Sequence, residues 1–293
     1  MSDLMNIDAG GCEPTARIDG MQHCRPTLSV GVVTYRSDES ALYTTLDSLA
    51  EAIEHAIRTG ALSGAEVVIV DNAASLRDAT LLPLKRKEIP AKLVLAQQNL
   101  GYGGGQNLAF EGVQSDYHLV LNPDVFVGVD AIRNAIRWMD ANPSAVLLAP
   151  DVCNLAGERS FLCRRMPSVF VLFLRGFAPR SVARVFRRSL AWHEMRDVVD
   201  GEHVVWDPPM VSGCFMLFRS TVYRALEGFD RRYFLYFEDY DLSLRAASQG
   251  RLAYVPHVRI SHAGGGASRK GLRHILMFGR SALTFFRLHG WRA

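Results

Sequence analysis

The chain has 293 residues, of which 48% are apolar and 22% are charged, and its formal net charge is +3. This composition is typical of a globular protein with a sizeable core and excludes a chain that is disordered throughout. No run approaches the roughly eighteen apolar residues of a membrane-spanning helix, and no apolar segment near the N-terminus predicts a signal peptide. The five cysteines are scattered without metal-site spacing, which favours a reducing cytoplasm.

The N-terminal part of the chain alternates apolar runs with amphipathic stretches. Residues 1–26 are polar and aperiodic, so we expect a loose lead-in. Residues 28–34 and 65–71 are β-branched and apolar and end in polar residues, which predicts two buried strands. Between them, apolar residues recur every three or four positions over 42–57, which predicts a helix.

The same alternation continues to about residue 140. Residues 91–96 and 117–121 predict two more strands, and residues 129–139 predict a helix. Alternating strands and helices are typical of the α/β class with a doubly wound, mostly parallel sheet. In such sheets ligands bind beyond the carboxyl ends of the strands. Polar side chains gather at these predicted ends: Thr34, Asp71, Asn72, Asn122 and Asp124.

The C-terminal half predicts elements that are less regularly spaced. We expect a buried strand over 211–218 and a short strand over 252–255. Helices are expected over 220–226, 239–248 and 270–289.

Two long segments carry basic residues and no acidic ones. Residues 159–193 contain eight arginines interleaved with bulky apolar residues, and residues 242–293 contain nine lysines or arginines. Such runs are typical of a solvated basic face, of nucleic-acid binding, or of attraction to anionic substrates and lipid headgroups. No helix-turn-helix, RNA-recognition or zinc-finger pattern accompanies them, so we expect no nucleic-acid partner. The pattern over 151–200 does not resolve its secondary structure.

Two motifs suit a nucleotide ligand. Asp71 and Asn72 stand at a strand end, where a carboxylate can accept the imide N–H of a uracil or thymine ring, although an Asx turn is an equally simple use of them. Residues 99–107, NLGYGGGQN, predict a glycine loop that opens a helix and lets the backbone approach a diphosphate. The alternative is a flexible turn, and no Lys-Ser/Thr of a P-loop follows.

Two residues suit a divalent metal. Asp124 ends a buried strand and offers the hard oxygen ligand that Mg²⁺ or Mn²⁺ requires, although a Pro-Asp turn explains it as well. His262 follows a later strand and suits a metal or a phosphate, although a lone histidine is more often structural.

Three acids open a predicted helix: Glu238, Asp239 and Asp241. Acids at a helix N-terminus are favoured by the helix dipole, which is the simple explanation. The aromatic residues around them would raise their proton affinity, as a general base requires. The spacing does not decide between Asp239 and Asp241 as the base.

In this order and spacing, the motifs resemble the family 2 glycosyltransferases, especially their rhamnosyltransferase-like group, which implies the GT-A fold and a hexosyltransferase activity. The resemblance covers about residues 28–262. It rests on the segments VGVVTY, VIVDNAAS, NLGYGGGQN, LNPDV, VSGCFMLFR, GFDRRYFLYFEDYDLSLR and VRISHAGGG.

The resemblance also implies roles for individual residues. Asp239 would be the catalytic base with Glu238 beside it, and Asp124 and His262 would hold Mg²⁺ or Mn²⁺. Asn122 departs from the family, because it stands where a strict DxD motif has its first Asp. The nucleotide-sugar donor would lie against Thr34, Asp71, Asn72, Asn99, Gly101, Gly103, Gly104, Gly105 and Asn107.

The implied domain is a GT-A glycosyltransferase unit over 27–267. It divides into a nucleotide-sugar half, 27–150, and an acceptor and catalytic half, 151–267, followed by a basic amphipathic helix over 268–293. The implied reaction moves L-rhamnose from dTDP-L-rhamnose to a saccharide and inverts the anomeric centre. By resemblance to the subgroup, we expect the saccharide to be lipid-linked and the reaction to belong to cell-surface polysaccharide synthesis.

Several alternatives stay open at this point. In the first alternative, the same fold uses a UDP-sugar as the donor. In the second, the chain is a non-catalytic nucleotide-binding protein of that fold. The basic segments either contact an anionic membrane from the cytoplasmic side, or they cover the acceptor cleft and pack in the core or in a homodimer.

Overall fold

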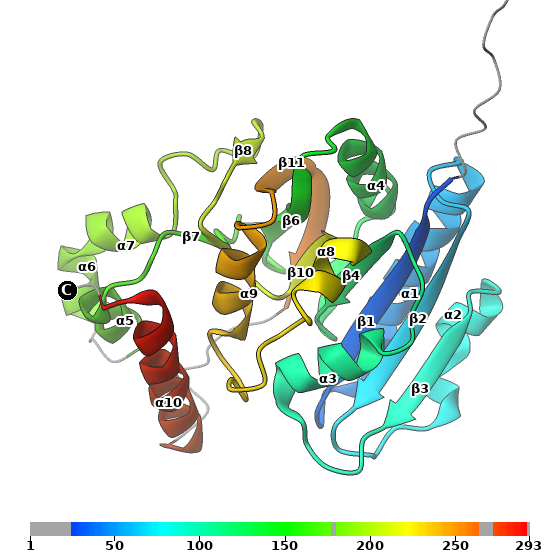
Figure 1. Ribbon diagram of the computed structural model, residues 1–293, viewed down its shortest axis with the longest axis horizontal. Coiled ribbons are helices and arrows are strands. Elements are labelled where there is room, and N and C mark those ends of the chain that lie inside the picture. Colours follow the sequence, from blue (N-terminus) through cyan, green and yellow to red (C-terminus); the bar gives the residue numbers. More distant parts are fainter. Residues whose placement is uncertain (1–24, 177–179, 264–271, 292–293) are drawn as a thin grey trace, which may run out of the picture.

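The computed structural model in Figure 1 describes residues 25–176, 180–263 and 272–291. The expected lead-in over 1–26 therefore lies almost entirely outside the described residues. The same holds for the expected boundary between residues 267 and 268. In the described part of the chain, none of the helices combines the length and apolarity that a membrane crossing demands.

The first half alternates strands and helices, as its periodicity predicts. α1 begins at Glu39, ahead of the predicted 42–57, because the Asp38 carboxylate caps it by accepting a hydrogen bond from the Ala41 N–H at 3.0 Å. The elements are β1 (Thr27–Thr34), α1 (Glu39–Arg58), β2 (Gly64–Asp71), the 3-10 helix η1 (Asp78–Leu81), α2 (Leu82–Arg86), β3 (Ala91–Leu95), α3 (Gly101–Phe110), β4 (Tyr117–Leu121), β5 (Val125–Val127) and α4 (Ala131–Ala141).

The second half adds three short helices in the stretch that the sequence pattern left unresolved. The elements are β6 (Ala145–Cys153), β7 (Cys163–Arg164), α5 (Val169–Gly176), α6 (Arg180–Val185), α7 (Arg187–His193), β8 (Val205–Trp206), β9 (Met210–Val211), β10 (Phe215–Arg219), α8 (Ser220–Ala225), α9 (Glu238–Ala246), β11 (Arg251–His262) and α10 (Leu272–His289).

One curled sheet runs through the molecule in the order β3-β2-β1-β4-β10-β6-β11-β5, with β8 paired to β11. The neighbours β3, β2, β1 and β4 are parallel, and so are β6 and β11. β10 is antiparallel to both strands that it joins. The expected α/β class with a mostly parallel sheet is therefore confirmed.

Three details differ from the sequence-based expectation. The strand expected over 211–218 is two strands, because β9 pairs with β7 and a turn at 212–214 separates it from β10. β11 is much longer than the expected 252–255, since it reaches His262 and pairs with β5. The division expected at residue 150 passes through β6, which ends at Cys153.

The sheet buries both of its faces, as a doubly wound sheet does. Alternate residues of β1 point to opposite sides, so that Val30 and Val32 pack with α1 and α4, whereas Val33 packs with α3. A separate buried cluster joins α9 to α10 and contains Phe237 and Phe285. The carboxyl ends of β1, β2 and β4 consequently meet at one edge, beneath α9 and beside α3 (Figure 1).

Candidate active site

Asp71, at the end of β2, is fully buried, and its carboxylate is held by the turn that follows. Oδ2 accepts hydrogen bonds from the N–H groups of Ser75 at 2.6 Å and Leu76 at 2.8 Å, and from the Ser75 hydroxyl at 3.2 Å. Oδ1 accepts one from the Ala73 N–H at 2.9 Å. These bonds form an Asx-type turn. Since a carboxylate oxygen has two lone pairs, Oδ1 keeps one acceptor position.

Asn72 and Asn99 shape the entry to α3. The Asn72 amide donates to the Gly101 carbonyl at 2.9 Å and accepts from the Leu100 N–H at 3.2 Å. Asn99 Oδ1 accepts from the Gly101 N–H at 2.9 Å. Thr34 is buried and lies in register with the last residue of β2. The structure thus brings these donor-side residues together at one sheet edge.

The glycine stretch lies within α3 rather than in a loop ahead of it. The helix begins at Gly101, and its glycines allow a close approach to the sheet and to the loop before α9. A Cβ at Gly103 would lie 2.7 Å from the Phe229 Cβ, and one at Gly105 would lie 2.7 Å from Val33. Tertiary packing therefore overrides the low helix propensity of glycine here.

Asn107 holds the loop that leads towards α9. Its amide donates to the Phe229 carbonyl at 2.8 Å and accepts from the Phe229 N–H at 2.8 Å and from the Tyr223 hydroxyl at 3.3 Å. Gly104, like Asn107, lies on a partly exposed position of the same helix. The Asn107 side chain is therefore tied to the protein's own backbone.

The structure brings Asp124 and His262 together, although 138 residues separate them. His262 Nε2 lies 3.1 Å from Asp124 Oδ1 and 3.4 Å from the amide nitrogen of Asn122. The pairing of β11 with β5 produces this contact, because His262 lies opposite Val125. In residues 25–176, 180–263 and 272–291, no three His, Cys, Asp or Glu side chains are grouped to hold a metal. The pair suits a metal that takes its other ligands from phosphate oxygens.

Glu238 and Asp239 form the first turn of α9. Burial raises the pKa of Glu238 to about 8, and the Asp239 charge adds to the rise. Burial also raises the pKa of Asp239, although the N–H groups of Gly213 and Tyr240, each at 2.9 Å from its carboxylate, oppose the rise. Glu238 Oε2 has no hydrogen-bond partner among the described residues. The pair has the proton affinity of a base that works near neutral pH.

The turn between β9 and β10 lies between Asp124 and Asp239. Its Gly213 N–H donates to Asp239, and its Cys214 carbonyl accepts from the Asn122 N–H at 2.9 Å. Burial raises the pKa of the Cys214 thiol to about 12, and the carboxylates of Asp124 and Asp239 both add to that rise. The expected metal ligand and the expected base therefore flank one turn.

Asp241, the other candidate base, has structural partners. It is buried, and its carboxylate accepts from Arg245 Nε at 2.7 Å and contacts His289 Nε2 of α10 at 2.8 Å. Asp239 is partly exposed instead. The geometry therefore favours Asp239 as the residue that reaches a substrate.

α10 also holds the turn that precedes α9. Tyr236 and Phe237 both have positive φ values, 73° and 66°, which is a strained conformation for aromatic residues. The Tyr236 hydroxyl contacts His274 Nδ1 at 2.8 Å, and the Ser281 hydroxyl donates to the Leu235 carbonyl at 2.8 Å. Both partners belong to α10, so this helix supports the backbone that orients Asp239.

Two neighbours of the acidic pair escaped the sequence analysis. The Tyr102 hydroxyl donates to the Gly213 carbonyl at 2.7 Å, which ties α3 to the turn beside Asp239. Arg164 of β7 is buried, and its charge lowers the pKa of Asp239 against the larger effect of burial. Tyr102 stands inside the glycine motif, which was a signal for it, but no pattern in the sequence marks Arg164.

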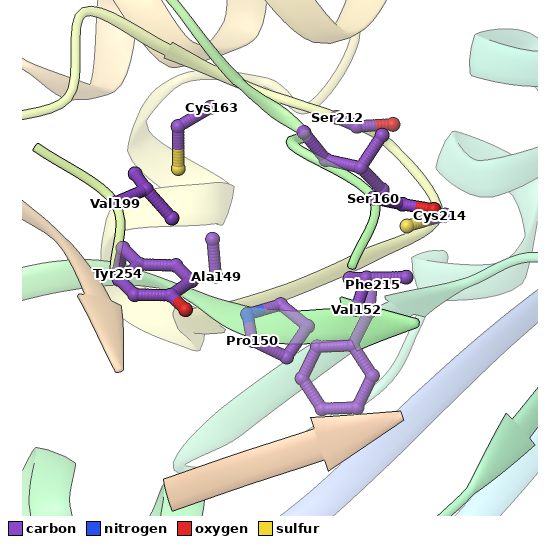
Figure 2. Close-up of a pocket in the computed structure, with 11 residues that line it drawn as sticks. Ala149, Pro150, Val152, Ser160, Cys163, Val199, Ser212, Cys214, Phe215 and Tyr254 are labelled. Carbon is purple, nitrogen blue, oxygen red and sulfur yellow. The ribbon is translucent and has the colours of Figure 1, made fainter. Parts of the chain in front are cut away.

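Figure 2 shows a small cavity behind the same turn. It is lined by side chains of β6, β7, β11 and the turn, among them Cys163, Ser212, Cys214 and Tyr254. Its volume of about 10 Å³ leaves room for about one water molecule. A hexose is therefore too large for this cavity.

The family model described as glycosyl transferase family 2 matches residues 29–226, which is more than half of the chain. The chain belongs to this family. The expected family and the expected hexosyltransferase activity are thereby confirmed.

Two curated relatives resemble the glycosyltransferase in sequence. The N-acetylglucosaminyl-diphospho-decaprenol L-rhamnosyltransferase of Mycobacterium tuberculosis is 29% identical over 286 residues, covering 90% of this chain and 86% of that protein. The rhamnosyltransferase WbbL of Escherichia coli is 27% identical over 177 residues, covering 55% of this chain and 60% of that protein.

Solved structures share the GT-A fold with the glycosyltransferase. The mannosyltransferase PcManGT from Pyrobaculum calidifontis, in complex with GDP-Man and Mn²⁺, has a TM-score of 0.53 at 18% identity and covers 92% of this chain and 77% of that one. TarS of S. aureus has a TM-score of 0.52 at 16% identity, and the match spans 80% of this chain and 60% of that one.

Proposed function

We propose that the glycosyltransferase moves L-rhamnose from dTDP-L-rhamnose to a lipid-linked saccharide on the cytoplasmic side, with inversion at the anomeric carbon. The match over 90% of the chain to a rhamnosyltransferase whose name specifies a diphospho-decaprenol acceptor carries this proposal. The second relative is also a rhamnosyltransferase, which supports the same donor sugar.

Asp239 acts as the general base in this proposal. Its carboxylate takes the proton of the acceptor hydroxyl as that oxygen attacks the anomeric carbon, and the nucleoside diphosphate leaves in the same step. The raised pKa of Asp239 favours proton uptake near neutral pH, and Gly213 and Tyr240 hold the carboxylate in place. Glu238, with its pKa of about 8, keeps a proton at neutral pH, so the pair carries about one charge.

The donor nucleotide binds at the edge formed by β1, β2 and the start of α3. Asp71 Oδ1 accepts one hydrogen bond, from the Ala73 N–H, and offers its remaining lone pair to the imide N–H of the nucleobase. Thr34, Asn72 and Asn99 shape this edge, and the first turn of α3 supplies backbone near the diphosphate. We assign Gly101, Gly103, Gly104, Gly105 and Asn107 to this wall of the donor site.

Asp124 and His262 would hold Mg²⁺ or Mn²⁺. A hard carboxylate oxygen and an imidazole nitrogen 3.1 Å apart fit such an ion, and Asn122 adds an amide beside them. When bound, a divalent ion neutralises charge on the departing diphosphate. We expect His262→Ala to raise the Mn²⁺ concentration for half-maximal activity at least tenfold, whereas the exposed His257→Ala leaves it unchanged.

A donor panel tests the proposed function. The full chain is incubated with dTDP-L-rhamnose or a UDP-sugar, Mg²⁺ or Mn²⁺, and a polyprenyl-diphosphate saccharide, and release of nucleoside diphosphate is measured. We expect turnover of dTDP-L-rhamnose alone, with an α-linked product by NMR. Turnover of a UDP-sugar alone would replace the donor but keep the reaction class. Donor binding without turnover on any acceptor would favour a non-catalytic nucleotide-binding protein.

A further inference from the structure

Helices α5, α6, α7 and α10 lie together at one end of the molecule, away from α1, α2 and β3 (Figure 1). Leu172 of α5 packs in the same buried cluster as Phe285 and Phe286 of α10, which makes these two helices neighbours. α5, α6 and α7 contact one another in turn. Four helices from two distant segments thus build one end of the protein.

The outer face of α10 carries an arginine row beside a leucine row. Arg273, Arg280 and Arg287 are exposed and recur every seven residues, which returns them to one face after two turns. Leu276 and Leu283 repeat at the same interval next to them and are 73% and 39% exposed. No acidic residue lies in the helix. The face is therefore basic and apolar together.

The short helices repeat this chemistry. Phe173, Val185 and Trp192 are 53%, 76% and 55% exposed on α5, α6 and α7 respectively. Arg187 and Arg188 are exposed on α7 beside them. Apolar side chains of this size gathered at one end of a protein mark an interaction surface.

We propose that the outer faces of α5, α6, α7 and α10 form one surface that docks on an anionic lipid bilayer. Arginines attract the headgroups, and large apolar side chains enter the boundary between headgroups and acyl chains. A second copy of the chain fits less well, because a symmetric contact would set each arginine row against its like. Nucleic acid matches the charge but gives leucine and valine no partner, since bases stack on aromatic rings.

The position of α10 connects this surface to catalysis. Its inner face contacts the strained turn through Ser281 and His274, and it contacts α9 through His289. A protein docked through α10 therefore presents Asp239 one helix away from the membrane. This arrangement suits an acceptor held in the bilayer, but the docking surface itself does not depend on the identity of the donor or the acceptor.

Co-sedimentation of the full chain with vesicles tests the proposal. One set of vesicles is phosphatidylcholine alone, and the other is an equal mixture of phosphatidylcholine and phosphatidylglycerol. The test variant replaces Arg273, Arg280 and Arg287 by glutamine. The matched control replaces three exposed cations at the other end, Arg58, Lys85 and Lys92, by glutamine.

We expect the wild type and the control to bind the mixed vesicles and not the neutral ones. The α10 variant should bind about a hundredfold more weakly, because each basic residue near an anionic surface contributes roughly a fivefold factor. Leu276→Ser with Leu283→Ser should weaken the binding that persists at high salt. Circular dichroism and Tm verify that each variant is folded.

Three results would overturn the proposal: no vesicle binding by the wild type at low ionic strength, equal loss of binding in the α10 variant and the control variant, or full binding by the α10 variant. A concentration-dependent dimer that the leucine changes dissociate, without vesicle binding, would assign the surface to a second copy. Transfer to a water-soluble acceptor analogue should be unchanged in the α10 variant. Failure of vesicle binding with transfer retained would therefore leave the proposed function intact.

Discussion

Asp71 and Glu238 are both buried carboxyl residues at the candidate active site, but the protein surrounds them differently. Asp71 accepts four hydrogen bonds from the turn after β2. Glu238 Oε2 has no partner among the described residues, and burial raises its pKa to about 8. A carboxylate whose acceptor positions are largely filled stabilises the turn around it, whereas a buried carboxyl group with an unpartnered oxygen favours its protonated form.

The largest effect is expected from an isosteric change at Asp239, the proposed base that pairs with Glu238. Asp239→Asn keeps the side-chain shape but cannot take up the acceptor proton, so we expect kcat/KM to fall about a thousandfold. The Tm should change little, because the loss of one backbone N–H acceptor is offset by the removal of a charge whose desolvation is unfavourable. Enzyme kinetics and calorimetry on the same preparation measure both quantities. An equal fall for Asp78→Asn, an exposed control, would contradict a special role for Asp239.

The same isosteric change should act on stability at Asp71. In Asp71→Asn one of the acceptor oxygens becomes an amide nitrogen, which leaves at least one part-buried N–H group of the turn without an acceptor. We expect the free energy of unfolding to fall by about 2 kcal/mol. Urea denaturation measures it, with Asp78→Asn again as the control. An unchanged midpoint would show that the turn does not depend on this carboxylate.

Glu238→Gln should alter the pH dependence of stability. Between its ordinary pKa and about 8, Glu238 binds a proton in the folded protein that it lacks in the unfolded chain, so stability falls as pH rises across this interval. The fall approaches about 1.4 kcal/mol per pH unit. Glu238→Gln should flatten the curve, whereas the exposed Glu111→Gln should not. Urea midpoints from pH 5 to pH 9 give the slopes, at roughly unit intervals.

The smallest effect is expected at the contact between α9 and α10. His289→Ala removes one of the partners of the buried Asp241 but leaves Arg245 in place. We expect a loss of about 1 kcal/mol in the free energy of unfolding, and His289→Gln should restore part of it by offering another donor. The exposed His257→Ala is the control. Equal stability of both alanine variants would mean that the contact of His289 with Asp241 does not stabilise the fold.

Local sequence patterns predicted much of the fold. β1, β2, β3 and β4 lie within one or two residues of their predicted ranges, because buried parallel strands are continuous apolar runs. The pattern over 151–200 was insufficient, since α5 is a short apolar run without helical periodicity and arginines interrupt the apolar residues of α6 and α7. The glycine segment was expected as a loop, and α3 includes it because contacts with Phe229 and Val33 outweigh helix propensity.

The sequence by itself determined which residue types stand at the strand ends and at the start of α9, because periodicity and capping are local properties. Only the tertiary structure decided which of them meet. The contact of His262 with Asp124 spans 138 residues, and that of His289 with Asp241 spans 48. Such contacts depend on strand pairing and on helix packing, which no short window of sequence contains. The same packing buries Glu238 and takes the carboxylate of the partly exposed Asp239 largely out of water, which raises the proton affinity of both.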